Sequence, residues 1–295
     1  MGVEQNGEKN RMIMNKRKLE EKIFNIIMRI AAFIIFGSLI AISITILIEG
    51  IPSMNMDMIT KTPQGGFYLG KEGGILNAIA GSFYLAIGAT LFALIICLPT
   101  VIYINIYAPK NSKFANLTRL CLDVLYGIPS IVFGAFGFVL MLLIGMKVSL
   151  LAGIITVGLL IVPIIARTMD EVIRQVPGEL QEAAFSLGAT RWETAIKVVL
   201  KQGLPGLATA ALLGFGRAIG DAASVMFTTG FTDNIPHSIN DPAATLPLAI
   251  FFQLSSPIAE VRERAYAAAL ILTVIIFAIS LLSRLLIKRF SKNTI

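Results

Sequence analysis

Apolar residues fall into six long runs along the chain, and polar residues gather in the connections between them. The runs lie at about residues 30–48, 75–107, 120–145, 148–167, 206–229 and 265–287. A membrane-spanning helix needs about 20 predominantly apolar residues, so each run is long enough to cross a bilayer. No small-residue cleavage site follows the first run, so we expect an uncleaved helix and not a signal peptide. The pattern predicts an all-α polytopic membrane protein with six transmembrane helices.

Composition supports this prediction, because 56% of the residues are hydrophobic and only 15% are charged, whereas a soluble domain has about 25% charged residues. A net charge of +7 could indicate nucleic acid as a partner. The basic residues instead lie beside the apolar runs, as orientation signals do. We therefore expect a lipid membrane and no nucleic acid as the environment of this chain.

The distribution of lysine and arginine predicts the orientation in the membrane. Of the 25 lysines and arginines, 19 fall on one side of the predicted spans, 5 on the other and one, Arg217, within a span. Cytoplasmic loops carry the excess of lysine and arginine. Both termini and the connection after the fourth run should therefore be cytoplasmic. Because no repeat or low-complexity linker appears, we expect a cytoplasmic N-terminal segment (1–22) and a single transmembrane domain (23–292).

The most polar connection, residues 176–205, predicts a hairpin of two short amphipathic helices. Gly188 stands where the first helix would end in the left-handed conformation that glycine adopts readily. Thr190 and Glu193 have the spacing of a capping box, which begins a second helix. Leu204-Pro205 would end that helix. A plain solvated connector and a docking platform for a soluble partner are both compatible with this pattern.

The fifth run contains Arg217 and Asp221, which lie one helical turn apart and are expected near the middle of the bilayer. Ionisable residues inside a span are costly and are functional candidates for that reason. Gly216 and Gly220 would leave room beside the arginine. One interpretation is a self-neutralising ion pair. The other is an anion-handling site, because a guanidinium presents a fixed fork of donors to phosphate oxygens.

Other titratable residues exclude several kinds of site. Arg119 and Asp123 are expected to form an ordinary ion pair near the cytoplasmic end of the third run. Cys97 and Cys121 lie in apolar stretches and are expected to be small core residues, not a disulfide or a metal site. With His237 as the single histidine and no Ser/His/Asp set or paired catalytic carboxylates, we expect no enzyme, no metal and no cofactor. No G-x-x-x-x-G-K-[ST] occurs, so the chain lacks the usual ATPase phosphate loop.

Glu182-Ala183-Ala184 followed by Gly188 resembles the EAA loop of permease subunits in bacterial ABC importers. The similarity continues through Ala189-Thr190-Arg191-Trp192 and departs at Lys201, where that family usually has proline. RAIGD (217–221) resembles the RA-[IL]-G-E segment of phosphate permeases, with aspartate in place of the usual glutamate, and GIPSIVFGAFG (127–137) resembles another of their apolar strings. The chain thus resembles permeases of the PstA/PstC type, and Thr245-Leu246-Pro247 is closer to PstA.

The resemblance implies a type I ABC-importer permease in a bacterial or archaeal cytoplasmic membrane. Its implied partners are a second homologous permease subunit, two ATP-binding subunits and an extracytoplasmic phosphate-binding protein, and its implied substrate is phosphate. The residues implied for ATPase coupling are Glu182, Ala183, Ala184, Gly188, Ala189, Thr190, Arg191 and Trp192, and those for the substrate path are Gly216, Arg217, Gly220 and Asp221. Alternatives are another oxyanion such as sulfate or molybdate, or an ion-driven secondary transporter or membrane sensor without an ATPase.

Overall fold

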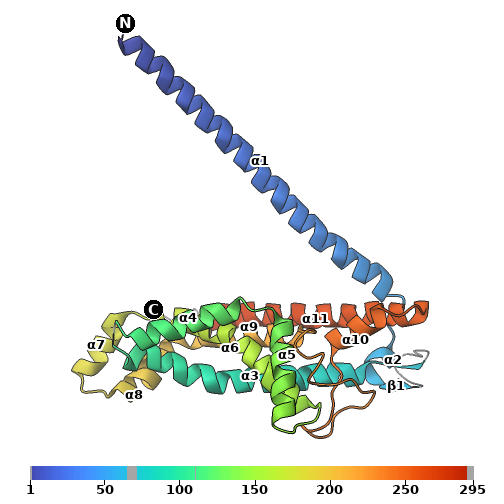
Figure 1. Cartoon of the computed structure of the whole chain (residues 1–295). Helices are drawn as coiled ribbons and strands as arrows, with labels where there is room; N and C mark the ends of the chain where they lie inside the picture. The colour runs from blue at the N-terminus through green and yellow to red at the C-terminus, as the bar shows by residue number, and fades with distance from the viewer. Residues whose placement is uncertain (1, 65–71, 110, 291–295) are drawn as a thin grey trace.

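The computed structural model describes residues 2–64, 72–109 and 111–290, so the paired glycines at 65–66 lie outside the described residues. The fold is all-α, as predicted, with most helices running along one axis and α1 projecting away from them (Figure 1). The helices are α1 (Gly2–Gly50), α2 (Met56–Thr60), α3 (Leu76–Ile102), α4 (Lys113–Tyr126), α5 (Ser130–Leu143), α6 (Leu150–Arg174), α7 (Gly178–Ser186), α8 (Arg191–Glu193), α9 (Lys201–Ile219), α10 (Leu246–Leu254) and α11 (Ala259–Phe290). Two π-helices, η1 (Tyr103–Tyr107) and η2 (Thr194–Leu200), continue α3 and precede α9. The strands β1 (Pro63–Gln64) and β2 (Glu72–Gly73) form a short antiparallel pair.

The core forms where α3, α6 and α9 pack together, because small residues let their backbones approach closely. Ala86, Ala89 and Ala93 are fully buried on α3. A Cβ at Gly214 of α9 would lie 2.3 Å from the Ile165 side chain of α6, so a larger residue would displace that side chain. Dispersion contacts between closely packed helices therefore hold this part of the bundle together.

Five of the described helices are long and apolar enough to cross a membrane, and the bent pair α4–α5 would make a sixth span. The third predicted run is therefore not one straight helix, because α4 and α5 meet at 103°. Gly127 ends α4, and Pro129 precedes the first residue of α5. Proline disfavours the helical conformation of the residue before it. Ile128 accordingly leaves the helix, and the chain turns.

The fifth predicted run is wrong in both of its boundaries. The helix does not stop at Leu204-Pro205, since α8, η2 and α9 are continuous from Arg191 to Ile219, with Pro205 inside. A Cβ at Gly206 would lie 2.6 Å from Val172 of α6, so packing against α6 holds the helix through the proline. The helix then ends ten residues earlier than the predicted Thr229.

Residues 220–245 follow α9 without forming a helix, and much of this segment is buried. Backbone groups at membrane depth must be satisfied inside the protein when they are not helical. The N–H groups of Leu150 and Leu151, in the first turn of α6, donate to the carbonyls of Asp241 and Ile239, both at 2.8 Å. The segment therefore supplies the acceptors that the first turn of α6 lacks.

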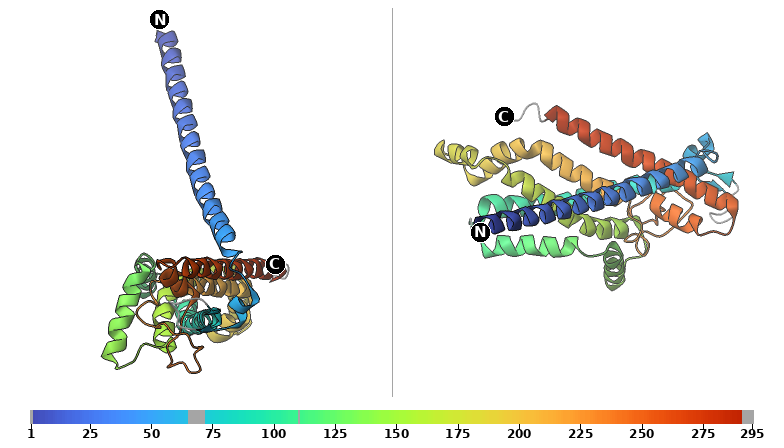
Figure 2. Two further views of the ribbon diagram at one scale, coloured as in Figure 1. Left: turned by 90° about the vertical axis from the view of Figure 1, so that its right-hand side faces the viewer. Right: turned by 90° about the horizontal axis from the view of Figure 1, so that it is seen from above.

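Helix α1 stands apart from the bundle and contacts α11 near its own C-terminal end (Figure 2). A Cβ at Gly50 would lie 2.8 Å from the Tyr266 carbonyl oxygen of α11, so glycine allows this close crossing. The apolar side chains of α1 from Ile23 to Ile48 are largely exposed. This chain alone does not cover the apolar surface of α1.

Candidate coupling hairpin and membrane anion site

The predicted hairpin is present, and its turn has the predicted conformation. Gly188 has φ of +82°, which L side chains rarely adopt. The Gly188 N–H donates to the Phe185 carbonyl at 2.9 Å, and the Ala189 N–H donates to the Ala184 carbonyl at 3.0 Å. These bonds satisfy carbonyls at the end of α7 and reverse the chain toward α8.

The capping box is also confirmed. The Glu193 N–H donates to the Thr190 hydroxyl oxygen at 3.2 Å, and the Glu193 carboxylate accepts the Thr190 N–H at 3.1 Å. Lys197 adds an exposed ion pair with Glu193 at 3.2 Å. Local hydrogen bonds thus fix the start of the second arm independently of any partner.

The hairpin lies at the same end of the bundle as the C-terminus of α11 (Figure 1), and it presents apolar side chains to its surroundings. Leu187 is 89% exposed and Trp192 is 61% exposed. Glu182, Ala183, Gly188, Thr190 and Arg191 are exposed as well, whereas Ala184 is buried and Ala189 is half-buried. An exposed group of large apolar side chains beside polar residues marks an interaction surface. Most of the residues implied for coupling are therefore accessible to a partner, and Ala184 packs within the hairpin.

Arg217 and Asp221 form the expected ion pair, with 2.8 Å between Arg217 Nη1 and Asp221 Oδ1. The Asp221 side chain is only 3% exposed, and its other oxygen accepts the Ser224 N–H at 2.9 Å and the Ser224 hydroxyl. The Arg217 side chain remains 40% exposed. The carboxylate is thus fixed from two sides, while the guanidinium has donors that Asp221 does not use.

Arg217 lies in the last turn of α9, which ends two residues later at Ile219 and does not continue to the predicted Thr229. A cation in the last turn of a helix is favourable, since the unpaired carbonyls there carry partial negative charge. A Cβ at Gly216 would meet nothing within 4 Å, and one at Gly220 would meet only ordinary contacts. Gly216 therefore borders open space. Neither glycine is a site of close helix packing, a role that Gly214 has instead.

Comparison with known families supports the ABC-importer resemblance. Residues 102–293 match the family described as binding-protein-dependent transport system inner membrane component. The chain belongs to this family. The permease is 31% identical to the phosphate transport system permease protein PstA of Haemophilus influenzae over 242 residues, which cover 82% of this chain and 84% of that protein. It is 30% identical to the PstA of Pasteurella multocida over 94% of this chain and 97% of that protein.

Solved structures show the same fold. The bacterial alginate ABC transporter has a chain that superposes on 90% of this permease with a TM-score of 0.62 at 16% identity, covering 93% of that chain. The inward-facing MetNI methionine ABC transporter gives a TM-score of 0.59 at 19% identity, covering 73% of this permease and 95% of that chain. The permease therefore has the all-α fold of ABC-importer membrane subunits, and its relatives are permeases, not enzymes.

The permease also contains a charged cluster that the sequence did not reveal. Arg119 does not pair with Asp123 as expected; it donates from Nε and Nη2 to the two carboxylate oxygens of Asp170, at 2.9 and 3.1 Å. Asp123 instead pairs with Arg167 at 3.0 Å. Asp170 is only 1% exposed and also accepts the Asn105 amide at 2.8 Å. The ion pairs therefore join α4 to α6, and they do not lie along α4.

The two cysteines have different surroundings. Cys97 is fully buried, and its Sγ donates to the Val162 carbonyl at 3.4 Å, so the prediction of a core residue is confirmed for it. Cys121 is exposed on α4, so the prediction that it is a core residue of this chain is wrong.

Proposed function

We propose that this permease is the membrane subunit of an ATP-driven phosphate importer and that Arg217 contacts phosphate on its path. The observation that carries the proposal is the partly exposed side chain of Arg217, which pairs at 2.8 Å with the buried carboxylate of Asp221. That carboxylate also accepts two hydrogen bonds from Ser224. The PstA relatives are permease proteins of phosphate transport systems. An arginine that stays 40% exposed in the last turn of a span is suited to an oxyanion.

Asp221 has a specific task in this proposal. Phosphate accepts hydrogen bonds from the donors of Arg217 that the carboxylate leaves unused. Ser224 keeps Asp221 in place through two hydrogen bonds while the anion is present. Repulsion between the carboxylate and phosphate then keeps binding weak enough for release. When phosphate leaves, Asp221 alone neutralises Arg217, so no unpaired charge remains in the membrane.

The hairpin supports the proposal of an ATPase partner. Its exposed Leu187 and Trp192 lie at one end of the bundle, beside Glu182 and Arg191. We assign this end to the cytoplasm, with both termini on that side, because the basic residues gather there. Two ATP-binding subunits would dock there, one on this chain and one on a second permease subunit. The opposite end, with α2, β1 and α10 (Figure 1), would receive an extracytoplasmic phosphate-binding protein.

Helix α1 supports the proposal of a second permease subunit. Its apolar face contacts little of this chain. A second, homologous membrane subunit beside the bundle would cover part of that surface and complete the path on the open side of Arg217.

The experiment that tests the proposal compares charge-neutralising variants in reconstituted complexes. Phosphate uptake, normalised to assembled complex, would be measured for Arg217→Gln, for Arg217→Lys and for Arg217→Gln combined with Asp221→Asn. The matched control is Arg284→Gln, which removes an exposed arginine from α11. Sulfate uptake measured in parallel distinguishes phosphate from another oxyanion.

We expect the Arg217→Gln/Asp221→Asn variant to assemble and its rate of phosphate uptake to fall by a factor of about ten or more. The reason is that hydrogen bonds to a charged group contribute about 1.5–3 kcal/mol. Lysine should restore only part of the rate, since it lacks the planar fork. The control should transport normally. Uptake near the wild-type rate in the doubly neutral variant would show that the pair is structural and that Arg217 is not a substrate residue.

A further inference from the structure

The hairpin is connected covalently to only two of the core helices. It lies in the chain between α6 and η2–α9, so any movement of the hairpin reaches those helices through the backbone. Helices α3 and α4 precede α6 and have no such connection. If they are to move with the hairpin, a non-covalent contact must carry the movement.

Helices α3 and α4 pack against α6, and one hydrogen bond also connects the hairpin directly to the end of η1. Arg191, the first residue of α8, donates from Nη1 to the Tyr107 carbonyl at 3.2 Å, across 84 positions of the sequence. Tyr107 is the last residue of η1, and Ala108 beyond it is extended. Carbonyls at the end of a helix lack intrahelical partners and attract cations. Arg191 therefore caps η1 from the hairpin through a hydrogen bond at the exposed surface.

From η1 the connection continues into the charged cluster. Asn105 lies in η1, two residues before Tyr107, and its amide donates to Asp170 at 2.8 Å. The side-chain oxygen Oδ1 of Asn105 accepts a hydrogen bond from Arg119 Nη2 at 3.3 Å. Arg119 belongs to α4 and Asp170 to α6. The segment η1 is thus bonded to the hairpin at its end and to α4 and α6 at its middle.

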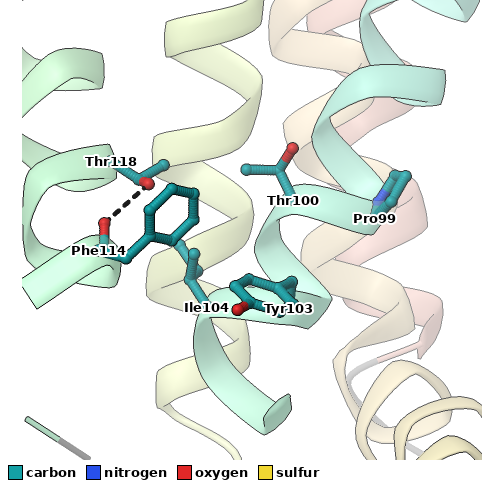
Figure 3. Close-up of a pocket in the computed structure, with 6 residues that line it drawn as sticks. All are labelled: Pro99, Thr100, Tyr103, Ile104, Phe114 and Thr118. Carbon is teal, nitrogen blue, oxygen red and sulfur yellow. Dashed lines mark hydrogen bonds between the residues drawn. The ribbon is translucent and has the colours of Figure 1, made fainter. Parts of the chain in front are cut away.

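The surroundings of η1 leave it room to change conformation. A groove of about 430 Å³ lies between α4 and the end of α3 with η1. It is lined by Pro99, Thr100, Tyr103, Ile104, Phe114 and Thr118 (Figure 3). The Thr118 hydroxyl donates to the Phe114 carbonyl of its own helix at 2.9 Å. Tyr103 and Phe114 make an edge contact with ring centroids 5.9 Å apart. A π-helix is a rare and local form of helix, often found at functional sites, and a groove beside it lacks the close packing that would fix it.

We propose that Arg191 is a positioning residue that transmits movement of the hairpin to η1 and, through Asn105, to the Arg119–Asp170 pair. The consequence is that α3 and α4 move together with α6 and α9 when the hairpin moves. This inference rests on the proposed docking of an ATPase on the hairpin. It adds the residues through which α3 and α4, which have no direct covalent connection to the hairpin, respond to its movement.

The experiment uses the complete complex of this permease with its second permease subunit and ATPase, reconstituted in liposomes with the binding protein. Arg191→Ala, Arg191→Lys, Asn105→Ala and the Arg191→Ala/Asn105→Ala double variant would be compared. Lys197→Ala is the matched control, because it removes a positive charge from the same hairpin without a contact to η1. Two quantities are measured for each complex: the amount of ATPase that co-purifies, and phosphate transported per ATP hydrolysed.

We expect Arg191→Ala to retain the ATPase at the wild-type ratio and to transport at least about fivefold less phosphate per ATP, the lower end of typical coupling between sites. Arg191→Lys should recover part of the loss, since its ammonium can also donate to the Tyr107 carbonyl. The double variant should be no worse than the more severe single variant, because both residues act in one connection. Lys197→Ala should leave both quantities unchanged.

Each contrary result identifies what is wrong. A ratio of phosphate to ATP within twofold of the wild type in Arg191→Ala would overturn the inference and leave the proposed function intact. Loss of the ATPase from Arg191→Ala would also overturn it, by showing that Arg191 contacts the ATPase directly. Effects that add in the double variant would show that Asn105 acts separately. A wild-type complex without an ATPase or without phosphate uptake would instead refute the proposed function.

Discussion

Two double-mutant cycles test the charged cluster between α4 and α6. One cycle combines Arg119→Gln with Asp170→Asn, which are paired in the structure at 2.9 Å. The other combines Arg119→Gln with Asp123→Asn, which are one turn apart on α4 but are not paired. Each cycle measures how far the effect of the double change departs from the sum of the single changes. Spacing along the helix predicts coupling in the second cycle, whereas the structure predicts it in the first.

The magnitude follows from the burial of Asp170, whose side chain is 1% exposed. Removing one partner of a buried ion pair costs about 3–5 kcal/mol. The lower end applies to Arg119→Gln, because Asn105 still donates to Asp170 at 2.8 Å and Arg167 Nη1 lies 3.6 Å away. We expect the loss to be about 3 kcal/mol for Arg119→Gln and much smaller once Asp170 is also neutral. Asp123, which is half exposed in its pair with Arg167, should contribute below ~1 kcal/mol.

Thermal unfolding of the purified subunit in detergent gives the assay. For a domain larger than 150 residues, 1 kcal/mol shifts Tm by about 2 °C, so Arg119→Gln should lower Tm by roughly 6 °C. Asp170→Asn in the same chain should restore most of that shift, and Asp123→Asn should restore none. Stronger coupling of position 119 to position 123 than to position 170 would refute the cross-helix pairing and support the pairing expected from the sequence.

Three further predictions address the turn, the packing and the orientation. Gly188→Val should leave the subunit inserted but reduce ATPase co-purification, because a φ of +82° costs an L side chain about 1–2 kcal/mol; wild-type yield would make the hairpin a plain connector. Gly81→Ala should lower Tm markedly, since its Cβ would lie 2.0 Å from the Ala244 carbonyl oxygen, whereas the control Gly216→Ala, which meets no atom within 4 Å, should not; equal Tm values would contradict this packing. In a cysteine-free background, an impermeant thiol reagent added outside cells should label a cysteine at position 55 and not one at position 190; labelling of 190 would reverse the orientation.

The parts of the structure that the sequence predicted correctly are those that short-range interactions determine. The left-handed turn at Gly188 needs glycine, and the capping box needs only Thr190 and Glu193, three residues apart. The Arg217–Asp221 pair is likewise formed within one turn and its neighbouring residues. The length of each apolar run indicated which segments are long and apolar enough to cross a membrane, apart from the bend at Pro129 and the boundaries of the fifth run.

The errors arose where tertiary contacts outweigh local preference. Arg119 had a partner of opposite charge one turn away, yet the neighbouring helix offers it a buried carboxylate with two oxygens in the right geometry. Pro205 would normally end a helix, but the Gly206 backbone packs against Val172 and the helix continues. The hydrogen bond from Arg191 to Tyr107 has no local signal at all, because it joins residues 84 positions apart.

The uninterrupted helix from Arg191 to Ile219 changes how the two candidate sites relate to each other. A helix that ended at Pro205 would have separated the hairpin from the span that carries Arg217. In the structure the same helix begins in the hairpin and carries Arg217 in its last turn, roughly 40 Å away at 1.5 Å per residue. Movement of the hairpin by a docked ATPase would therefore displace Arg217 directly, while Asp221, just beyond the helix, stays bonded to Ser224. The 2.8 Å pair spans that boundary, so a small shift of the helix would alter the distance between guanidinium and carboxylate, and with it the balance between holding phosphate and releasing it.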